Sequence, residues 1–248
     1  MTRLLVIPAA GRGSRLGGGV PKPLVEIAGR PMLDHLADLH RPFVDRLLVV
    51  ANPFSIDAIG AWARAHGADV AVQREPTGML DAILLAAPSI QARRPDRIWI
   101  TWADQVGVLP ATVRRLAVIE SDVAAPALIV PTVRRSNPYI HFSRAADGRI
   151  SGLLQRREGD VMPESGEGDI GLFAMSRATF DEDLAEYAGL GASGAGTGER
   201  NFLPFVPWLA ARKSVVTFPC SDPMEAVGVN TPADRESIEA WMRARRPA

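Results

Sequence analysis

Residues 4–24, with the sequence LLVIPAAGRGSRLGGGVPKPL, join an apolar run to a loop rich in glycine. The run Leu4–Ala9 is long enough for one buried strand. The glycines that follow leave room for backbone N–H groups to approach an anion without a Cβ atom in the way. A buried strand that leads into such a loop is typical of α/β proteins, in which ligands bind beyond the carboxyl ends of parallel strands.

The alternation of strand and helix continues through the first half of the chain. Strands are predicted at Leu4–Ala9, Arg46–Ala51, Asp69–Gln73 and Arg97–Trp102, and helices at Pro31–His40, Ile56–His66 and Gly78–Ala87. Apolar strands separated by helices indicate a parallel sheet that is covered on both faces. We therefore expect an α/β, doubly wound, Rossmann-like fold with a mixed, mostly parallel sheet.

The pattern changes after about Pro126. The predicted elements there are strands at Ala127–Val133 and Ile170–Met175, a hairpin of Tyr139–Ser143 and Arg149–Gln155 around Asp147-Gly148, and a capped helix start at Thr231-Pro232-Ala233-Asp234. Five glycines between Gly189 and Gly198 predict a mobile loop. We expect a single domain over residues 1–248, with the hairpin as a small extension.

The composition excludes several classes of protein. The 248 residues carry a formal net charge of zero, which gives no support for non-specific binding to nucleic acid or to an anionic membrane. The first apolar run is too short to span a membrane and lacks the layout of a signal peptide. Cys220 is the only cysteine, so an intrachain disulfide is impossible and a reducing cytoplasm is the expected location.

The glycine-rich loop also carries cationic side chains. Arg15 can donate two parallel hydrogen bonds to a phosphate, and Lys22 adds a compact point charge. Lysine occurs only twice in the chain, so its presence in this loop is informative. A Rossmann fingerprint would need glycine where Leu16 stands, and the Gly-Lys-Ser/Thr of a P-loop is absent. The loop therefore indicates phosphate binding of another kind.

Two segments of this loop, Ala-Ala-Gly-x-Gly-x-Arg-Leu and Pro-Lys-Pro-Leu, resemble the signature of the sugar-1-phosphate nucleotidyltransferases. The nearest likeness is to the uridylyltransferase domain of the N-acetylglucosamine-1-phosphate uridylyltransferases, without their acyltransferase domain. The resemblance implies the nucleotide-diphospho-sugar transferase type of fold. Residues 1–125 would form the NTP-binding half, and residues 126–248 the acceptor-binding half and the C-terminal helix.

The resemblance also implies roles for individual residues in the first half. Ala10, Gly11 and Gly13 would bind the nucleotide, while Arg15 and Lys22 would be catalytic and stabilise the leaving pyrophosphate. The family's Gln-x-x-x-x-Gly segment, which contacts the base, is matched by Gln73 and Gly78, although Met79 stands where the family has threonine. A glutamine amide with a backbone N–H suits a pyrimidine edge.

A metal site is implied by two further matches. Asp104 ends an apolar strand, where the family has an aspartate that binds Mg²⁺ and serves catalysis. Asn230 lies in Gly228-Val229-Asn230, which is similar to the family's Gly-Val-Asn with its second metal ligand. One carboxylate and one amide oxygen, completed by water and substrate oxygens, suit Mg²⁺. Without the resemblance, Asn230 reads equally well as a turn residue before the capped helix.

The acceptor half departs from the pattern of the N-acetylglucosamine enzymes. Ile140, Gln155 and Asp169 stand where those enzymes have a glycine, a glutamate and an asparagine that contact the sugar, whereas Glu199 matches. We expect these four residues to bind the acceptor and to disfavour N-acetylglucosamine 1-phosphate. Asp169 would face the part of the acceptor distant from its phosphate, or else pair with Arg157 or Arg200 and have no influence on specificity.

The resulting functional prediction is a Mg²⁺-dependent enzyme that transfers NMP from an NTP, expected to be a pyrimidine NTP, to a sugar phosphate and releases pyrophosphate. The same chemistry on a cyclitol phosphate, an alcohol phosphate or a phosphonate is the first alternative. A nucleotide-binding regulatory subunit without turnover is the second. The expected partners are the NTP and the acceptor, with neither nucleic acid nor membrane, in a monomer or homodimer.

Overall fold

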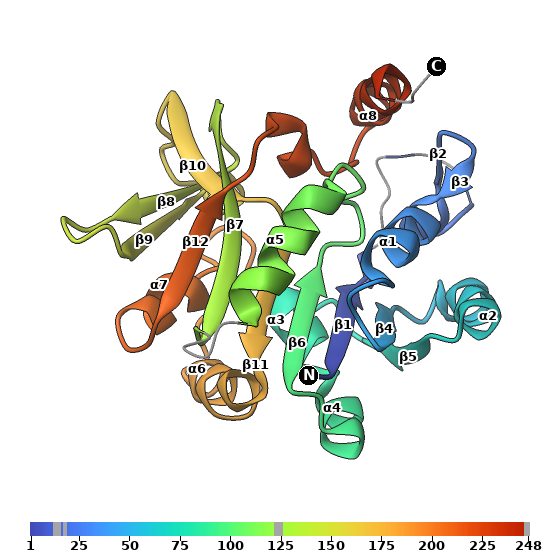
Figure 1. Cartoon of the computed structure of the whole chain (residues 1–248), viewed down its shortest axis with the longest axis horizontal. Coiled ribbons are helices and arrows are strands. Elements are labelled where there is room, and N and C mark those ends of the chain that lie inside the picture. The colour runs from blue at the N-terminus through green and yellow to red at the C-terminus, as the bar shows by residue number, and fades with distance from the viewer. Residues whose placement is uncertain (12–15, 17–18, 122–125, 246–248) are drawn as a thin grey trace.

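The computed structural model of the chain describes residues 1–11, 16, 19–121 and 126–245. Within these residues, eight strands form one sheet with the order β10-β7-β11-β6-β1-β4-β5, and β12 pairs with β7. Figure 1 shows this sheet running through the whole molecule, with the β8–β9 hairpin at one end and α2 at the other. The fold is the mixed, mostly parallel α/β arrangement that the sequence predicted, and this prediction is confirmed.

The first half of the chain supplies the parallel core of the sheet. Its strands are β1 (Arg3–Pro8), β4 (Arg46–Ala51), β5 (Asp69–Val72) and β6 (Arg97–Thr101), and β1 lies between β4 and β6 in parallel register. Its helices are α1 (Met32–His40), α2 (Ile56–His66), α3 (Met79–Leu84), α4 (Ala87–Arg93) and α5 (Pro110–Glu120). A short helical turn, η2 (Lys22–Leu24), and the small strands β2 (Glu26–Ile27) and β3 (Arg30–Pro31) precede α1.

The helix predicted at Gly78–Ala87 is two helices in the structure, α3 and α4. The chain turns at Leu85 and Ala86, and Pro88 occupies the first turn of α4. Proline has no N–H to donate to the preceding turn, so one continuous helix through this position would lose a hydrogen bond and clash with a carbonyl group.

The second half extends the same sheet. Its strands are β7 (Leu128–Ser136), β8 (Ile140–Arg144), β9 (Ile150–Gln155), β10 (Ser165–Asp169), β11 (Leu172–Ser176) and β12 (Val215–Pro219). Its helical segments are η3 (Arg156–Glu158), η4 (Thr179–Leu184), α6 (Ala185–Gly189), α7 (Phe205–Ala210), η5 (Pro223–Ala226) and α8 (Pro232–Ala244). Strands β10 and β11 are antiparallel to β7, whereas β12 is parallel to it.

Strand β10 has no apolar pattern, since its sequence is Ser-Gly-Glu-Gly-Asp. Its glycines are required by the hairpin that packs beside it. A Cβ atom on Gly168 would lie 2.7 Å from the carbonyl oxygen of Ile140, and one on Gly166 would lie 2.6 Å from Nδ1 of His141. The close approach of β8 therefore decides these residues, and the usual apolar signal for a strand is missing.

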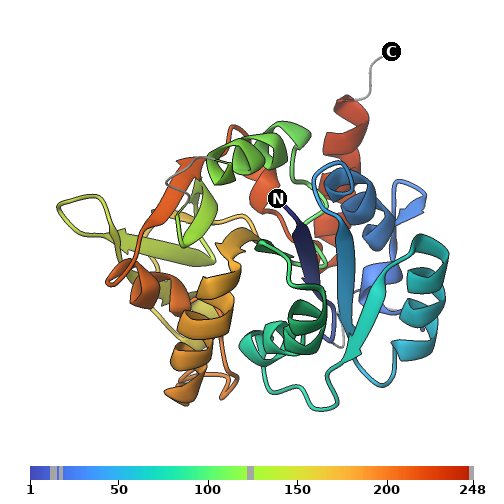
Figure 2. The same ribbon diagram turned by 60° about the horizontal axis from the view of Figure 1, so that its bottom comes forward.

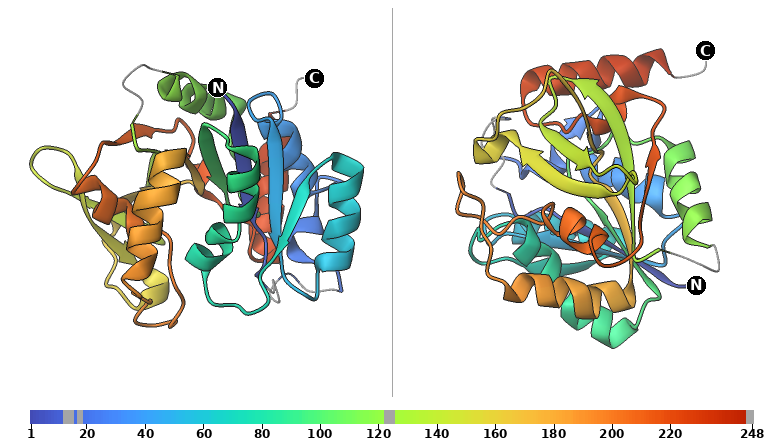
Figure 3. Two further views of the ribbon diagram at one scale, coloured as in Figure 1. Left: turned by 90° about the horizontal axis from the view of Figure 1, so that it is seen from below. Right: turned by 90° about the vertical axis from the view of Figure 1, so that its left-hand side faces the viewer.

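Two apolar cores cover the two faces of the sheet. Helices α1, α2, α5 and α8 bury their apolar side chains on one face, around Trp99 and Leu36. Helices α3, α4, α6 and α7 and the β8–β9 hairpin cover the other face, around Phe173 and Phe205. Figure 3 shows α5 and α6 on opposite sides of the strands. Both faces are buried, which explains why the central strands are continuous apolar runs.

The last helix returns to the first half of the chain. Helix α8 packs beside β2, where the backbone N–H of Ala28 donates to Oε1 of Glu239 at 3.0 Å. Figures 1 and 2 show α8 on the same side of the molecule as α1, β2 and β3. The segment that leads into α8 therefore crosses from β12 to the carboxyl ends of β1 and β6, and it carries Asn230 with it. Among the described residues, no helix combines the length and apolar character needed to cross a membrane.

Candidate active site

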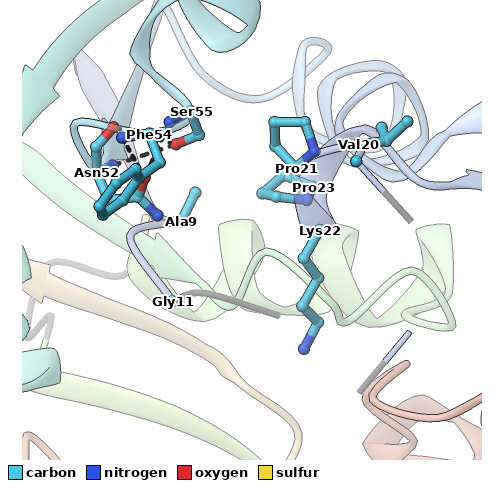
Figure 4. Close-up of a pocket in the computed structure, with 10 residues that line it drawn as sticks. Ala9, Gly11, Val20, Pro21, Lys22, Pro23, Asn52, Phe54 and Ser55 are labelled. Carbon is cyan, nitrogen blue, oxygen red and sulfur yellow. Dashed lines mark hydrogen bonds between the residues drawn. The ribbon is translucent and has the colours of Figure 1, made fainter. Parts of the chain in front are cut away.

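An open cavity of about 370 Å³ lies at the carboxyl ends of β1 and β4. Residues of three segments line it: Ala9 and Gly11 after β1, Gly19 to Pro23 before and within η2, and Asn52, Phe54 and Ser55 after β4. Figure 4 shows Ala9, Asn52, Phe54 and Ser55 on one wall and Val20, Pro21 and Pro23 on the other. Of the predicted nucleotide-binding residues in this loop, Gly11 lines the cavity and Ala10 lies between the lining residues Ala9 and Gly11, while Gly13 and the predicted catalytic residue Arg15 lie outside the described residues.

Asn52 fixes the shape of the cavity wall, and the sequence analysis missed it. Its Nδ2 donates to the carbonyl oxygen of Ala10 at 2.9 Å, and its Oδ1 accepts the backbone N–H groups of Phe54 and Ser55, each at 2.9 Å. The side chain thereby joins the end of β4 to the end of β1. The Asn-Pro pair directly after a predicted strand was an available signal, because it marks a turn.

Lys22 is in contact with both predicted metal ligands. Its Nζ atom donates to Oδ2 of Asp104 at 2.6 Å and to Oδ1 of Asn230 at 2.8 Å. These residues are 82 and 208 positions away from Lys22 in the sequence. All three side chains are half-buried. The structure therefore brings together one carboxylate oxygen and one amide oxygen around a single cationic group.

The backbone holds Asp104 and Asn230 side by side. The N–H of Val229 donates to the carbonyl oxygen of Asp104 at 3.0 Å. A Cβ atom on Gly228 would lie 3.2 Å from the carboxyl carbon of Asp104, so this position favours glycine. Asn230 is followed by a capping box, in which Thr231 and Asp234 satisfy each other's backbone N–H groups. The start of α8 thus fixes where Asn230 lies.

The donor set fits a magnesium ion. The ammonium group of Lys22 already acts as a cation between the two oxygens, so the position accepts positive charge. Among the described residues there is no group of three or more His, Cys, Asp and Glu side chains that could hold a metal. A divalent cation here would take one oxygen from Asp104 and one from Asn230, and water and substrate oxygens would supply the rest, as Mg²⁺ sites commonly do.

Gln73 and Gly78 meet at the end of β5. Nε2 of Gln73 donates to the carbonyl oxygen of Gly78 at 3.0 Å, and the side chain is almost fully buried. The backbone N–H of Gln73 donates to the carbonyl oxygen of Ala51 at 2.8 Å, which places the end of β5 beside the end of β4. Because Nε2 is held by Gly78, the amide oxygen of Gln73 is the atom left to accept a hydrogen bond from a ligand.

Gly78 is also one of the places where the two halves of the chain are in contact. Its φ is +126°, and a Cβ atom there would lie 2.4 Å from the carbonyl oxygen of Arg200. The N–H of Arg200 donates to the carbonyl oxygen of Thr77 at 2.8 Å, and the carbonyl oxygen of Arg200 accepts the N–H of Leu80 at 2.9 Å. Arg200 also pairs with Asp81. Only glycine allows the two backbones to pack this closely.

The predicted acceptor residues Ile140 and Gln155 lie opposite each other in the β8–β9 hairpin. The carbonyl oxygen of Ile140 contacts Gly168, the residue before Asp169. Asp169 ends β10, and its Oδ1 accepts the N–H of Gly171 at 2.7 Å. Burial raises the pKa of Asp169 to about 6. The hydrogen bond from Gly171 lowers the pKa, but by less than burial raises it.

The alternative in which Asp169 pairs with Arg157 or Arg200 is wrong. Arg157 pairs with Glu199 at 2.6 Å, and Arg200 pairs with Asp81 at 2.5 Å. Arg157 lies in the helical turn η3 after β9, and Arg200 lies in the contact beside Gly78. Asp169 therefore sits at the edge of the sheet with a raised pKa and without either predicted partner.

Glu199 lies in the glycine-rich segment that was expected to be a mobile loop. Glu158 anchors this segment, because its carboxylate accepts hydrogen bonds from Thr197, from the N–H of Gly196 and from Nδ2 of Asn201. These hydrogen bonds lower the pKa of Glu158 to about 2, against the opposing effect of desolvation. Glycines make the segment flexible in principle, but four charge-assisted hydrogen bonds and the Arg157–Glu199 pair hold it in place here.

Lys22, Asp104 and Asn230 meet at the edge of the sheet where α/β proteins bind ligands, and Gln73 lies at the same edge, beyond β4. This arrangement is the one expected of a nucleotidyltransferase domain. The comparison with known families leads to the same class and makes it specific. Residues 5–167 match the MobA-like NTP transferase domain, and the chain belongs to this family.

Among the curated proteins that the chain resembles are bifunctional GlmU proteins. The chain is 29% identical to that of Acidithiobacillus ferrooxidans and 27% identical to that of Burkholderia thailandensis, in each case over 237 residues. These matches cover 95% of this chain but 50% and 51% of the relatives. The chain thus spans about half the length of the curated relatives it matches.

Solved structures share the fold at low sequence identity. A protein from Bacillus anthracis, named a putative glucose-1-phosphate thymidylyltransferase, aligns with a TM-score of 0.76 at 14% identity, over 100% of this chain and 98% of its own. A CMP:2-keto-3-deoxy-manno-octonic acid synthetase in complex with CTP aligns with a TM-score of 0.69 at 20% identity, over 99% and 100%. HddC from Yersinia pseudotuberculosis, in complex with GMP-PN, aligns with a TM-score of 0.66 at 18% identity, over 98% and 100%.

Proposed function

We propose that the protein transfers NMP from an NTP to a sugar phosphate or a similar small phosphorylated acceptor and releases pyrophosphate. The observation that carries the proposal is the convergence of Lys22, Asp104 and Asn230 at 2.6 and 2.8 Å, beside a cavity at the glycine-rich loop. Family membership and the curated relatives support the same class of reaction.

The reaction is a single displacement at the α-phosphorus of the NTP. A phosphate oxygen of the acceptor forms a bond to that phosphorus, and the bond to the β-phosphate oxygen breaks, so that pyrophosphate leaves with the electron pair. No general base is required, because the attacking phosphate oxygen is already ionised. The protein's task is to align two anions that repel each other and to neutralise charge as the leaving group departs.

Each predicted residue has a place in this scheme. Asp104 and Asn230 would hold Mg²⁺, which supplies positive charge to phosphate oxygens when it is bound. Lys22, together with Arg15, would stabilise the leaving pyrophosphate. Lys22 would then exchange its present oxygen partners for those of the pyrophosphate.

The base of the NTP would be read at the end of β5. The free amide oxygen of Gln73 would accept an N–H from the base edge, and the backbone near Gly78 would complete the contact. We propose a pyrimidine nucleotide on this ground, since an acceptor and a donor in this arrangement match one edge of a pyrimidine.

The acceptor is the less constrained substrate. Ile140, Gln155, Asp169 and Glu199 would bind it, and we propose that N-acetylglucosamine 1-phosphate reacts weakly or not at all. Ile140 fills space that a glycine would leave open, and Gln155 offers hydroxyl groups a weaker acceptor than a carboxylate. Cyclitol phosphates, alcohol phosphates and phosphonates would undergo the same chemistry. A regulatory subunit without turnover is the competing function, although retention of Lys22, Asp104 and Asn230 in one contact favours catalysis.

The deciding experiment is a panel assay of pyrophosphate release. UTP, CTP, dTTP, ATP and GTP would each be combined with sugar 1-phosphates, a cyclitol phosphate, an alcohol phosphate and a phosphonate at fixed Mg²⁺. Turnover with a sugar 1-phosphate and a pyrimidine NTP is the expected result. Nucleotide binding without pyrophosphate release in any combination would favour the regulatory subunit.

A further inference from the structure

Phe54 is a large apolar side chain in an unusual position. It is 84% exposed and lines the cavity at the glycine-rich loop. Figure 4 shows it beside Ala9 and Asn52, on the wall opposite Val20 and Pro21. An exposed aromatic ring on the wall of a cavity is the arrangement that ligand sites use for a flat apolar group.

The backbone around Phe54 is fixed even though its ring is exposed. Oδ1 of Asn52 accepts the N–H of Phe54 and the N–H of Ser55, both at 2.9 Å. Pro53, which lies between Asn52 and Phe54, restricts the backbone further through its fixed φ. The same asparagine donates to the carbonyl oxygen of Ala10 at 2.9 Å. The ring therefore projects from a rigid turn that is tied to the glycine-rich loop, which reduces the entropy lost when a ligand contacts it.

Phe54 follows β4, and this position indicates which part of a bound nucleotide it would contact. In the strand order, β4 lies between β1 and β5. The glycine-rich loop follows β1. Gln73 follows β5, and its backbone N–H donates to the carbonyl oxygen of Ala51, the last residue of β4. A nucleotide with its phosphates at the loop and its base at Gln73 would pass over the end of β4, which is where Phe54 lies.

We propose that Phe54 is the stacking surface for the nucleobase of the bound NTP. This inference rests on the proposed function, because it assumes that an NTP occupies the cavity. Gln73 would contact the edge of the base, while the phenyl ring would cover one of its faces. The stacking contact would contribute affinity for any base, since every base has a π-face, and the choice among bases would fall to Gln73.

The test compares ligands with and without a base. Binding of UTP, CTP, ATP and GTP, and of inorganic tripolyphosphate, would be measured by calorimetry for the wild-type protein, Phe54→Ala and Phe54→Tyr. Stacking of a base on an aromatic side chain contributes about 1–3 kcal/mol, so Phe54→Ala should weaken each NTP by about 5- to 150-fold. Tripolyphosphate binding should change less than twofold, and Phe54→Tyr should keep NTP binding within about threefold of the wild type.

Val118 supplies the matched control, because it is also an exposed apolar side chain but lies on α5, outside the residues that line the cavity. Val118→Ala should bind every ligand like the wild type. Equal NTP affinity of the wild type and Phe54→Ala would overturn the inference and leave the proposed function intact. Equal weakening of NTP and tripolyphosphate would also overturn it, because the effect would then come from the loop. Absence of NTP binding to the wild type would instead refute the proposed function itself.

Discussion

The ammonium group of Lys22 donates a 2.6 Å hydrogen bond to the carboxylate of Asp104, which lies 82 residues further along the chain. The same nitrogen reaches Oδ1 of Asn230 at 2.8 Å. In this structure a lysine of the phosphate-binding segment thus occupies the space between the two proposed ligands of a divalent cation.

Replacing Lys22 should affect metal binding and turnover in opposite directions. Lys22→Ala should lower kcat/KM. The loss of transition-state stabilisation should be about 2–4 kcal/mol, the usual scale for loss of one charge-stabilising donor. It should also tighten Mg²⁺ binding in the absence of NTP, because the ammonium no longer competes for the two oxygens. Steady-state kinetics would measure the effect on turnover. The rise in unfolding temperature with Mg²⁺ concentration would measure the effect on metal binding. Lys213→Ala removes the chain's other lysine, which pairs with Asp183, and should change neither quantity.

Asp104→Ala should nearly abolish turnover and leave the fold intact. Its carboxylate is half-buried at a strand end, and the backbone hydrogen bond from Val229 to its carbonyl oxygen does not depend on the side chain. Pyrophosphate release at several Mg²⁺ concentrations, with circular dichroism as a check on folding, would measure this. Asp181→Ala, at an exposed aspartate that pairs with Arg177, is the control. Near wild-type activity of Asp104→Ala at low Mg²⁺ would show that this residue holds no metal.

Gly78→Ala should destabilise the protein and impair nucleotide binding together. An added Cβ atom would lie 2.4 Å from the carbonyl oxygen of Arg200, and φ is +126°. We expect a loss of at least about 2 kcal/mol in the free energy of unfolding. Gly29→Ala shares the positive φ but would meet no atom within 4 Å, so it isolates the backbone strain from the clash. Denaturant unfolding of both variants gives the comparison, and equal losses would mean that contact with Arg200 is unimportant.

Asp169→Asn should raise stability at neutral pH and alter the choice of acceptor. Burial raises the pKa of Asp169 to about 6, above its ordinary value of 3.8, so the folded state binds more protons between these values. Stability is then greatest below about pH 4 and falls as pH rises through 6, by no more than about 3 kcal/mol. The variant should therefore exceed the wild type at pH 8 and lose this advantage towards pH 4. An unchanged order of acceptors in the panel assay would remove Asp169 from the acceptor site.

His40→Leu should remove part of the protein's sensitivity to acid. Among the described residues, neither ring nitrogen of His40 has a hydrogen-bond partner, and burial lowers its pKa from 6.5 to about 3. The unfolded state binds the proton more readily, so stability falls as pH drops below 6.5, by about 2 kcal/mol at pH 5. Unfolding by urea at pH 5 and pH 7 should show a smaller pH dependence for the variant. The same dependence in both proteins would assign the acid sensitivity to other groups.

The sequence by itself determined the class of fold and indicated candidate site residues in the first half of the chain. The runs at 4–9, 46–51 and 97–102 form parallel strands because both faces of the sheet are buried, which leaves an apolar signal that a single sequence displays. Asp104 could be predicted as a candidate site residue because a polar side chain after such a strand lies at the ligand edge of the sheet, whereas Gln73 was predicted only from the family resemblance.

Only the tertiary structure decided which distant residues meet. Nothing near Lys22 in the sequence specifies Asn230, which reaches it because the segment before α8 crosses back to the first half of the sheet. The glycines of β10 and Gly78 are required by backbones that approach from elsewhere, so their local sequence carries no apolar period. Arg157 pairs with Glu199 and Arg200 pairs with Asp81, and neither pairs with Asp169. An ion pair depends on three-dimensional distance and not on the spacing of residues in the chain.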